Sequence, residues 1–263
     1  MKETKKILIA NRGVIAIRAL RAAKELGYEV ASVYSTVDRD QKHLKLSDEA
    51  ICIGPGPAKD SYLNEAAIIA AAELANVDAI YPGYGFLAEN AAFAEKCNES
   101  GFKFIGPDPK VIEIMGDKIR AKELVSSLGI PIVPGYSGDI QSNEQMRSIV
   151  KGIGYPVIVK ATSGGGGKGM RIVNSEDELW DSIVSAQNEA KLAFGDGKVF
   201  IEKYLNKPRH IEIQVFGDGK GKAVHLYSRD CSLQRKYQKI LEEAPALNIS
   251  KEKLDEIQNI CVK

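Results

Sequence analysis

The sequence is poor in the residues that build metal sites. Its 263 residues include only four cysteines, three histidines and one tryptophan. The cysteines are scattered and form no C-x-x-C pair; they are Cys52, Cys97, Cys231 and Cys261. This spacing argues against a zinc site and is typical of free thiols in a cytoplasmic protein.

An excess of charge of one sign and long apolar runs are also lacking. The 36 basic and 35 acidic side chains give a formal net charge of +1, so no overall field favours nucleic acid or an anionic membrane. The apolar run "ILIA" near the start is shorter than the roughly 7–15 residues of a signal-peptide core. No stretch approaches the roughly 18 apolar residues of a membrane span. We therefore expect a cytoplasmic protein that binds neither nucleic acid nor membrane.

Strands alternate with helices in the first part of the chain. The segment "KKILIANRG" predicts a buried strand, and "VIAIRALRAAKELG" follows with apolar residues at helical spacing. The alternation continues through "YEVASVYS", "EAICIGP", "LNEAAIIAAAELANV", "DAIYPGYG", "NAAFAEKCNESG" and "FKFIG". Strands separated by helices of this length predict a parallel sheet with helices on both faces. We place this α/β domain at residues 1–110.

The pattern changes after residue 110. Residues 111–135 predict a helical connector that ends in a segment rich in Pro and Gly. Within 136–204, the strands "YPVIVKA" and "GMRIV" flank a glycine run, and Ser175 with Glu178 predicts a helix start of the capping-box type. Within 205–263, alternating polarity around Gly-Asp-Gly predicts a β-hairpin. This order of elements indicates a second, different domain.

The four consecutive glycines of "KATSGGGGKGMRIV" require a physical reason, because glycine loses the most backbone freedom on folding. The Walker pattern fails, since Thr162 stands where its first glycine belongs and Gly169 follows Lys168. The dinucleotide-binding pattern fails because it requires a helix where "MRIV" predicts a strand. Two interpretations stay open: a hairpin tip that closes over a triphosphate, and a mobile surface linker.

Several motifs together resemble one family. They are "KILIANRG", "SYLN", "PGYGFLAEN", "FIGP", "MGDK", "YPVIVKATSGGGGKGMRIV", "EKYL", "PRHIEIQV" and "RDCSLQRKYQKILEEAPA". With these motifs, the chain resembles biotin carboxylase, the ATP-grasp component of biotin-dependent carboxylases, over nearly its whole length. The resemblance implies a Rossmann-like N-terminal domain followed by an ATP-grasp fold that is incomplete at its C-terminus. Residues 136–204 would be the lid subdomain, and 205–263 the start of the C-terminal subdomain.

The resemblance also implies which residues contact ATP. Lysines would bind the phosphates, the glycine run would cover them, and the end of the "IEKYL" strand would read the adenine. The expected ATP ligands are Lys118, Lys160, Gly165, Gly166, Gly167, Glu202, Lys203, Tyr204, Leu205, His210, Gln234 and Tyr237. Lys239 is implied on the bicarbonate side and Tyr84 in the biotin region. Taken singly, each has a structural alternative, such as a solvated lysine or an edge-strand charge.

In this family, ATP and bicarbonate form carboxyphosphate, and biotin is then carboxylated. The resemblance thus implies ATP, Mg²⁺ and carrier-bound biotin, with a biotin carboxyl carrier protein and a carboxyltransferase as partners, a homodimer, and a role such as fatty acid biosynthesis. The family's metal-binding glutamates would lie beyond Lys263. We therefore expect no metal ligand in this chain, and a fragment that at most binds nucleotide.

Three positions depart from the family pattern. Glutamate is usual at the position of Val14, and histidine is usual at the positions of Tyr81 and Tyr237. Tyrosine at 237 can donate a hydrogen bond but carries no positive charge. The alternatives are another ATP-grasp ligase, such as the carbamoyl phosphate synthetase type, and a nucleotide-binding module that has lost its chemistry. A nicotinamide oxidoreductase fits least, because "ANRGVIA" lacks the later glycines of the dinucleotide fingerprint.

Overall fold

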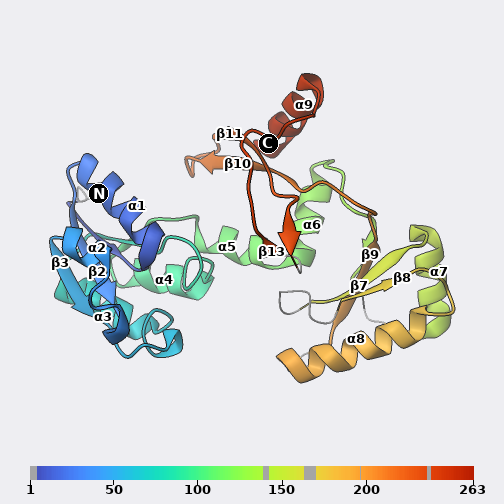
Figure 1. Ribbon diagram of the computed structural model, residues 1–263, viewed down its shortest axis with the longest axis horizontal. Coiled ribbons are helices and arrows are strands. Elements are labelled where there is room, and N and C mark those ends of the chain that lie inside the picture. The colour runs from blue at the N-terminus through green and yellow to red at the C-terminus, as the bar shows by residue number, and fades with distance from the viewer. Residues whose placement is uncertain (1–4, 139–141, 163–169, 196, 236–237) are drawn as a thin grey trace. The chain divides into compact units, whose positions relative to one another are not determined.

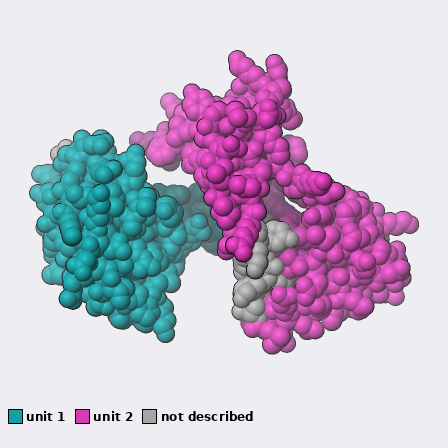
Figure 2. Space-filling model, in the orientation of Figure 1, with its two compact units in different colours: residues 1–117 teal, residues 118–263 magenta. Residues whose placement is uncertain are grey.

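The computed structural model describes residues 5–138, 142–162, 170–195, 197–235 and 238–263. The chain forms two compact units, residues 1–117 and 118–263, shown in different colours in Figure 2. The division falls inside the predicted helical connector. The finer boundaries that we place at residues 110, 135 and 204 stay predictions.

The first unit is built on a five-stranded parallel sheet (Figure 1). Its strand order is β3-β2-β1-β4-β5, which confirms the predicted Rossmann-like arrangement. The strands are β1 (Lys6–Ile9), β2 (Glu29–Tyr34), β3 (Glu49–Cys52), β4 (Ala79–Tyr81) and β5 (Lys103–Phe104). The helices are α1 (Gly13–Glu25), α2 (Lys42–Leu46), α3 (Glu65–Leu74), α4 (Ala91–Glu99) and α5 (Pro109–Gly116), with short 3₁₀ turns at Thr36–Asp38 and Ala58–Asp60.

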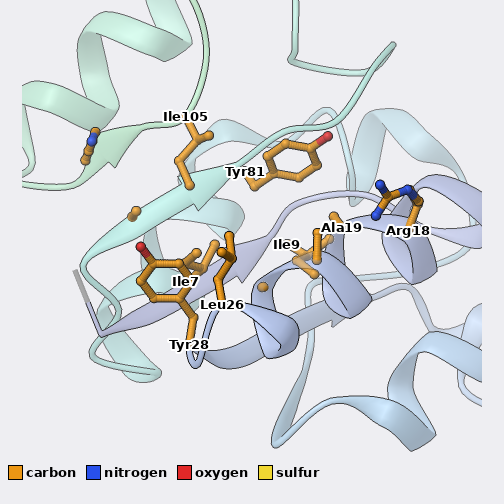
Figure 3. A pocket seen from close by; sticks show the side chains of 12 residues that line it. Ile7, Ile9, Arg18, Ala19, Leu26, Tyr28, Tyr81 and Ile105 are labelled. Atoms are coloured by element: carbon orange, nitrogen blue, oxygen red, sulfur yellow. The ribbon is translucent and has the colours of Figure 1, made fainter.

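The two faces of this sheet are covered to different extents. Side chains of α3 and α4 pack with those of the strands in the larger hydrophobic cluster, whereas α1 packs on the opposite face. Beside α1, a pocket of about 490 Å³ remains open between helix and strands (Figure 3). Its apolar lining includes Ile7, Ile9, Ala19, Leu26, Tyr81 and Ile105. Tyr81, one of the three departures from the family pattern, thus lines this pocket.

The second unit begins with α6 (Lys118–Ser127) and contains an antiparallel sheet of order β6-β9-β7-β8. The strands are β6 (Gly135–Tyr136), β7 (Val157–Ala161), β8 (Arg171–Val173) and β9 (Val199–Lys203), and the helices packed on them are α7 (Asn143–Ile153) and α8 (Leu179–Phe194). The strands β7 and β8 are antiparallel neighbours in this sheet. The segment 163–169 between them, which carries the glycine run, lies outside the described residues.

The remainder of this unit contains a second antiparallel pair, β10 (Ile211–Gly217) and β11 (Ala223–Asp230). The Gly-Asp-Gly turn connects them, and the Asp218 carboxylate accepts hydrogen bonds from the amides of Lys220 and Lys222. The predicted hairpin is therefore confirmed. Two short strands, β12 (Gln234–Arg235) and β13 (Gln238–Lys239), and the helix α9 (Lys251–Cys261) complete the described elements.

The start of α8 differs from the prediction. The capping-box pattern predicts a helix that opens at Ser175, but α8 begins at Leu179 with Glu178 as its N-cap. The Glu178 carboxylate turns back and accepts a hydrogen bond from the amide of Asn174, 3.1 Å away. That amide lies one residue before the one expected for the Ser175 pattern, so the side chain supports a turn that precedes the helix.

The four cysteines are free thiols in two different environments. Cys52 and Cys261 are exposed, whereas Cys97 and Cys231 are buried. Burial, with the nearby charge of Glu65, raises the pKa of Cys97 to about 12. We expect iodoacetamide to modify Cys52 first and Cys97 last, because the thiolate is the nucleophile and must be accessible. Peptide mass spectrometry over time checks this order, and early labelling of Cys97 would contradict it.

Within the described ranges, no helix is both long and apolar enough to cross a membrane.

Candidate functional site

A buried carboxylate lies beside the strand that enters the glycine run. Glu202, in β9, is 7% exposed. The register of the sheet places it opposite Ile158 of the neighbouring strand β7. The Nζ of Lys160, also in β7, lies 2.6 Å from Glu202 Oε2. The structure therefore brings together two of the residues predicted to contact ATP.

Sequence reasoning missed a third member of this group. Lys122, in α6, forms an ion pair with the other carboxylate oxygen of Glu202. Both ammonium groups also lie over the ring of Phe200, at 5.6 Å for Lys122 and 5.8 Å for Lys160. Cations placed over an aromatic face are attracted by its quadrupole. Two cations, one carboxylate and one ring thus form a compact group, which we call the Glu202 cluster.

The end of β9 is held in place by its own backbone and by Lys203. The amide of Lys203 donates to the carbonyl of Pro134, and the amide of Tyr204 donates to the carbonyl of Pro156. The Nζ of Lys203 donates to the carbonyls of Gly154 and Tyr155, at 2.9 and 2.7 Å. The side chain of Lys203 therefore fixes the chain where the strand ends, and the exposed Leu205 follows.

His210 and Gln234 lie together in the structure. The amide nitrogen Nε2 of Gln234 is 2.8 Å from Nδ1 of His210, and it also donates to the carbonyl of Cys231. Because the side-chain amide nitrogen of Gln234 can only donate, His210 Nδ1 is the acceptor of this hydrogen bond. Both side chains are exposed, so their outward-facing polar atoms are accessible to a ligand.

Lys239, in β13, belongs to a second charged group, which also includes Glu212 of β10 and Arg229 of β11. Its Nζ contacts Glu212 Oε2 at 3.1 Å and Glu242 Oε1 at 2.8 Å. Arg229 lies directly across the hairpin from Glu212 and forms an ion pair with it. Hydrogen bonds to the two glutamates raise the pKa of Lys239 well above its usual value, so the ammonium stays charged.

The pKa of Glu212 is lowered by its neighbours in this group. Burial by itself raises the pKa, but hydrogen bonds from Arg229, Lys239 and Cys231 outweigh it and lower the pKa to about 2. A carboxyl whose pKa is lower in the folded than in the unfolded chain stabilises the fold above its ordinary pKa. That stabilisation disappears as the pH falls through the folded-state value.

We therefore expect Glu212→Gln to lower the free energy of unfolding at neutral pH by on the order of 1–2 kcal/mol, after allowance for solvent screening. The difference from wild type should narrow as the pH falls from about 4.5 towards 2. Urea titrations at several pH values measure it. Asp255→Asn, on the exposed side of α9, is the matched control. A difference that is constant with pH would contradict the assignment.

Some predicted ATP ligands cannot be placed. The side chain of Lys118, at the start of α6, is outside what the structure describes. Gly165, Gly166, Gly167 and Tyr237 also lie outside the described residues. Their predicted roles in binding the nucleotide stay predictions.

Tyr84 lies in the first unit, in the loop that follows β4. Tyr84 is 65% exposed, and its carbonyl accepts a hydrogen bond from Asn11 Nδ2. The same nitrogen donates to the carbonyl of Pro82. Gly83 between them has φ +72°, and a Cβ there would lie 2.9 Å from Asn11 Nδ2. The amide of Asn11 thus holds this loop so closely that only glycine fits.

Arg12 and Asp38 form a second set of contacts near this loop. The ring of Phe86, in the same loop, stacks on Tyr62 with centroids 4.9 Å apart, and the Arg12 guanidinium lies 5.1 and 5.6 Å from the centroids of Tyr62 and Phe86. Asp38 accepts hydrogen bonds from Arg12, Ser35 and Tyr62 at 2.9, 2.6 and 2.8 Å. Burial raises the pKa of Asp38, but these bonds reverse the shift and leave it below its usual value.

Comparisons with known proteins identify the family of the chain. A family model for the biotin carboxylase N-terminal domain matches residues 3–112, and one for the carbamoyl-phosphate synthase L chain ATP binding domain matches 117–263, more than half of the chain. The biotin carboxylase of Haemophilus influenzae is 55% identical over 257 residues, 97% of this chain and 57% of that protein. The chain belongs to the biotin carboxylase family.

Solved structures give the same result. The biotin carboxylase–β,γ-ATP complex of Campylobacter jejuni has a TM-score of 0.92 at 49% identity, over 98% of this chain and 58% of that one. The biotin carboxylase domain dimer of Hydrogenobacter thermophilus 2-oxoglutarate carboxylase, solved with MgADP, ADP and bicarbonate, has a TM-score of 0.89 at 47% identity, over 99% and 57%. The predicted fold class is therefore confirmed.

The chain spans somewhat more than half of the length of these biotin carboxylases. The second family model is named after carbamoyl-phosphate synthase, so the ATP-binding half taken alone does not distinguish the two ligase types. The N-terminal model and the 55% identical relative select biotin carboxylase.

Proposed function

We propose that this chain carries the nucleotide-binding part of an enzyme that uses ATP and bicarbonate to carboxylate biotin. The observation that carries the proposal is the Glu202 cluster, in which Lys160 at the end of β7 is paired with Glu202 immediately before the glycine run. Its relatives include a biotin carboxylase solved with a nucleotide and a biotin carboxylase domain solved with ADP and bicarbonate.

The chemistry explains why lysines matter here. Bicarbonate is a weak nucleophile, and phosphoryl transfer to it brings two anions together, so positive charge must be placed near the phosphates. Lys160 lies in β7, just before the glycine run in the sequence, and supplies one such charge. Lys239, which its glutamate partners keep charged, is proposed to supply another on the bicarbonate side.

The adenine is proposed to bind at the end of β9. Since the amides of Lys203 and Tyr204 already donate to Pro134 and Pro156, we assign the adenine edge to the carbonyl of Lys203 and the amide of Leu205. The carboxylate of Glu202 is proposed to accept from the adenine amino group. The exposed His210–Gln234 pair is assigned to the ribose.

When bound, Mg²⁺ would neutralise negative charge on the phosphates. Among the described residues, one group has the spacing of metal ligands, namely Glu212, Cys231 and Glu242. Its carboxylates contact Arg229 and Lys239. Mg²⁺ requires oxygen ligands in a regular octahedron, and two neighbouring cations oppose it. These residues do not fit Mg²⁺, and we assign them none.

The remaining partners follow from the family and are proposals. Biotin on a biotin carboxyl carrier protein would approach the region of Tyr84, and a carboxyltransferase would take the carboxyl group onward. Assembly as a homodimer and a location in the cytoplasm are proposed. A role in fatty acid biosynthesis is one of several, because one relative is part of a 2-oxoglutarate carboxylase.

Calorimetric titration with a non-hydrolysable ATP analogue tests the proposal. The chain should bind the analogue and should not bind NADH, which separates it from a nicotinamide enzyme. A crystal structure of the complex should place the triphosphate beside Lys160. An analogue bound away from Lys160, or no binding, would refute the nucleotide site. ADP release by a full-length version, stimulated by biotin and not by ammonium, would separate it from the carbamoyl-phosphate type.

A further inference from the structure

Glu202 presents one carboxylate oxygen to each of two lysines. Lys160 Nζ lies 2.6 Å from Oε2, and Lys122 pairs with Oε1. The Glu202 side chain is 10% exposed, while the side chains of Lys160 and Lys122 are 30% and 37% exposed. The carboxylate is therefore nearly sequestered from water, and the two ammonium groups are partly solvated.

The two lysines come from different elements. Lys160 lies in β7, next to the segment 163–169, whereas Lys122 lies in the second turn of α6. Only Lys160 is therefore adjacent in sequence to the glycine run. A triphosphate bound beside Lys160 would attract its ammonium more strongly than the single charge of Glu202 does, because the triphosphate carries several negative charges.

A difficulty follows for Glu202 if Lys160 turns towards phosphates. A buried carboxylate that loses its only cationic partner is strongly disfavoured, because its charge is then neither hydrated nor paired. We propose that Lys122 is the permanent counter-ion of Glu202, which allows Lys160 to leave the carboxylate when nucleotide binds. Lys122 is thus a positioning residue, and this inference rests on the proposed nucleotide site.

The ring of Phe200 supports the exchange. Both ammonium groups lie within 6 Å of its centroid, and the residue is 8% exposed. When Lys160 moves, Lys122 keeps both the carboxylate and the ring contact. The alternative role for Lys122 is direct attraction of the phosphates, which would not require Glu202 at all.

A double-mutant cycle separates these roles. Affinities for a non-hydrolysable ATP analogue are measured by calorimetry, with a chelator present, for wild type, Lys122→Met, Glu202→Gln and the double variant. Lys122→Met should weaken binding roughly tenfold, near the lower end of the effect of losing a hydrogen bond to a charged group. In the Glu202→Gln background, the same change should have little effect, because no buried charge then needs a partner.

Each outcome bears on the inference. An equal loss in both backgrounds would overturn it, since Lys122 would then act on the phosphates directly, and so would an unchanged affinity of Lys122→Met. Wild type that binds no analogue would refute the nucleotide site itself, and this inference with it. Lys122→Arg should retain affinity near that of wild type, which a neutral but well-folded Lys122→Gln should not.

The control is Lys151→Met, an exposed lysine in α7 of the same unit, which should leave the affinity unchanged. Thermal unfolding of each variant shows whether it is folded. If Lys122→Met does not fold, the affinities of Lys122→Arg and Lys122→Gln are compared instead. The comparison is made both with Glu202 intact and in the Glu202→Gln background, and it tests the same role of Lys122.

Discussion

Replacing Asp38 with alanine is expected to lower the free energy of unfolding of residues 1–117 by about 3 kcal/mol, the lower end of the range for breaking a buried ion pair. Asp38 is 5% exposed and accepts hydrogen bonds from three side chains. Without it, Ser35 and Tyr62 lose their acceptor in a buried site, and Arg12 loses its counter-ion. The partial exposure of Arg12, at 39%, keeps the effect from being larger.

Urea unfolding, followed by circular dichroism, measures this change. Asp40→Ala is the matched control, because Asp40 is exposed two residues away, and its replacement should change stability by less than about 0.5 kcal/mol. The pKa of Asp38 is lower in the folded than in the unfolded chain. The loss of stability caused by Asp38→Ala should therefore become smaller as the pH falls below the pKa of an ordinary aspartate. Equal effects of the two substitutions would show that the hydrogen-bond network contributes little.

Replacing Lys160 with methionine is expected to weaken the binding of an ATP analogue about 100-fold. Hydrogen bonds between an ammonium and a phosphate are charge-assisted, and the loss of one typically costs about 1.5–3 kcal/mol. The fold should be retained, because Lys122 still pairs with Glu202 after the change. The substitution should therefore lower the affinity for the analogue without a comparable loss of stability.

Calorimetry in the presence of a chelator measures the affinity, and thermal unfolding reports on the fold. Lys191→Met, in the last turn of α8, is the control with the same chemical change on an exposed helix face. If Lys160→Met bound the analogue as tightly as wild type, Lys160 would be a partner of Glu202 alone. The proposed phosphate site would then be wrong.

The architecture of the first unit could be predicted because each of its signals is local. A buried strand followed by a helix of matching length repeats along the chain, and a parallel sheet follows from that alternation. Gly27 ends the turn after α1 with φ +82°. The hairpin around Asp218 was predictable for the same reason, since its turn residues are contiguous.

Two ion pairs of the charged groups could not be predicted in this way. Lys122 pairs with Glu202 only because α6 lies beside β9, and no spacing along the sequence encodes that contact. The pairing of Glu212 with Arg229 depends on the register of the hairpin, which shifts between Ile213 and Val215. A simple count outward from the Gly-Asp-Gly turn misses that irregularity.

The contacts of Asn11 and Arg12 have a consequence for how the first unit unfolds. Asn11, just after β1, donates hydrogen bonds to the carbonyls of Pro82 and Tyr84. The next residue, Arg12, donates to Asp38 of the 3₁₀ turn, and Asp38 also accepts a hydrogen bond from Tyr62. Segments fastened to one another in this way separate together, as a single cooperative unit. We therefore expect the loop that carries Tyr84 to unfold together with the sheet core, although Tyr84 itself is exposed.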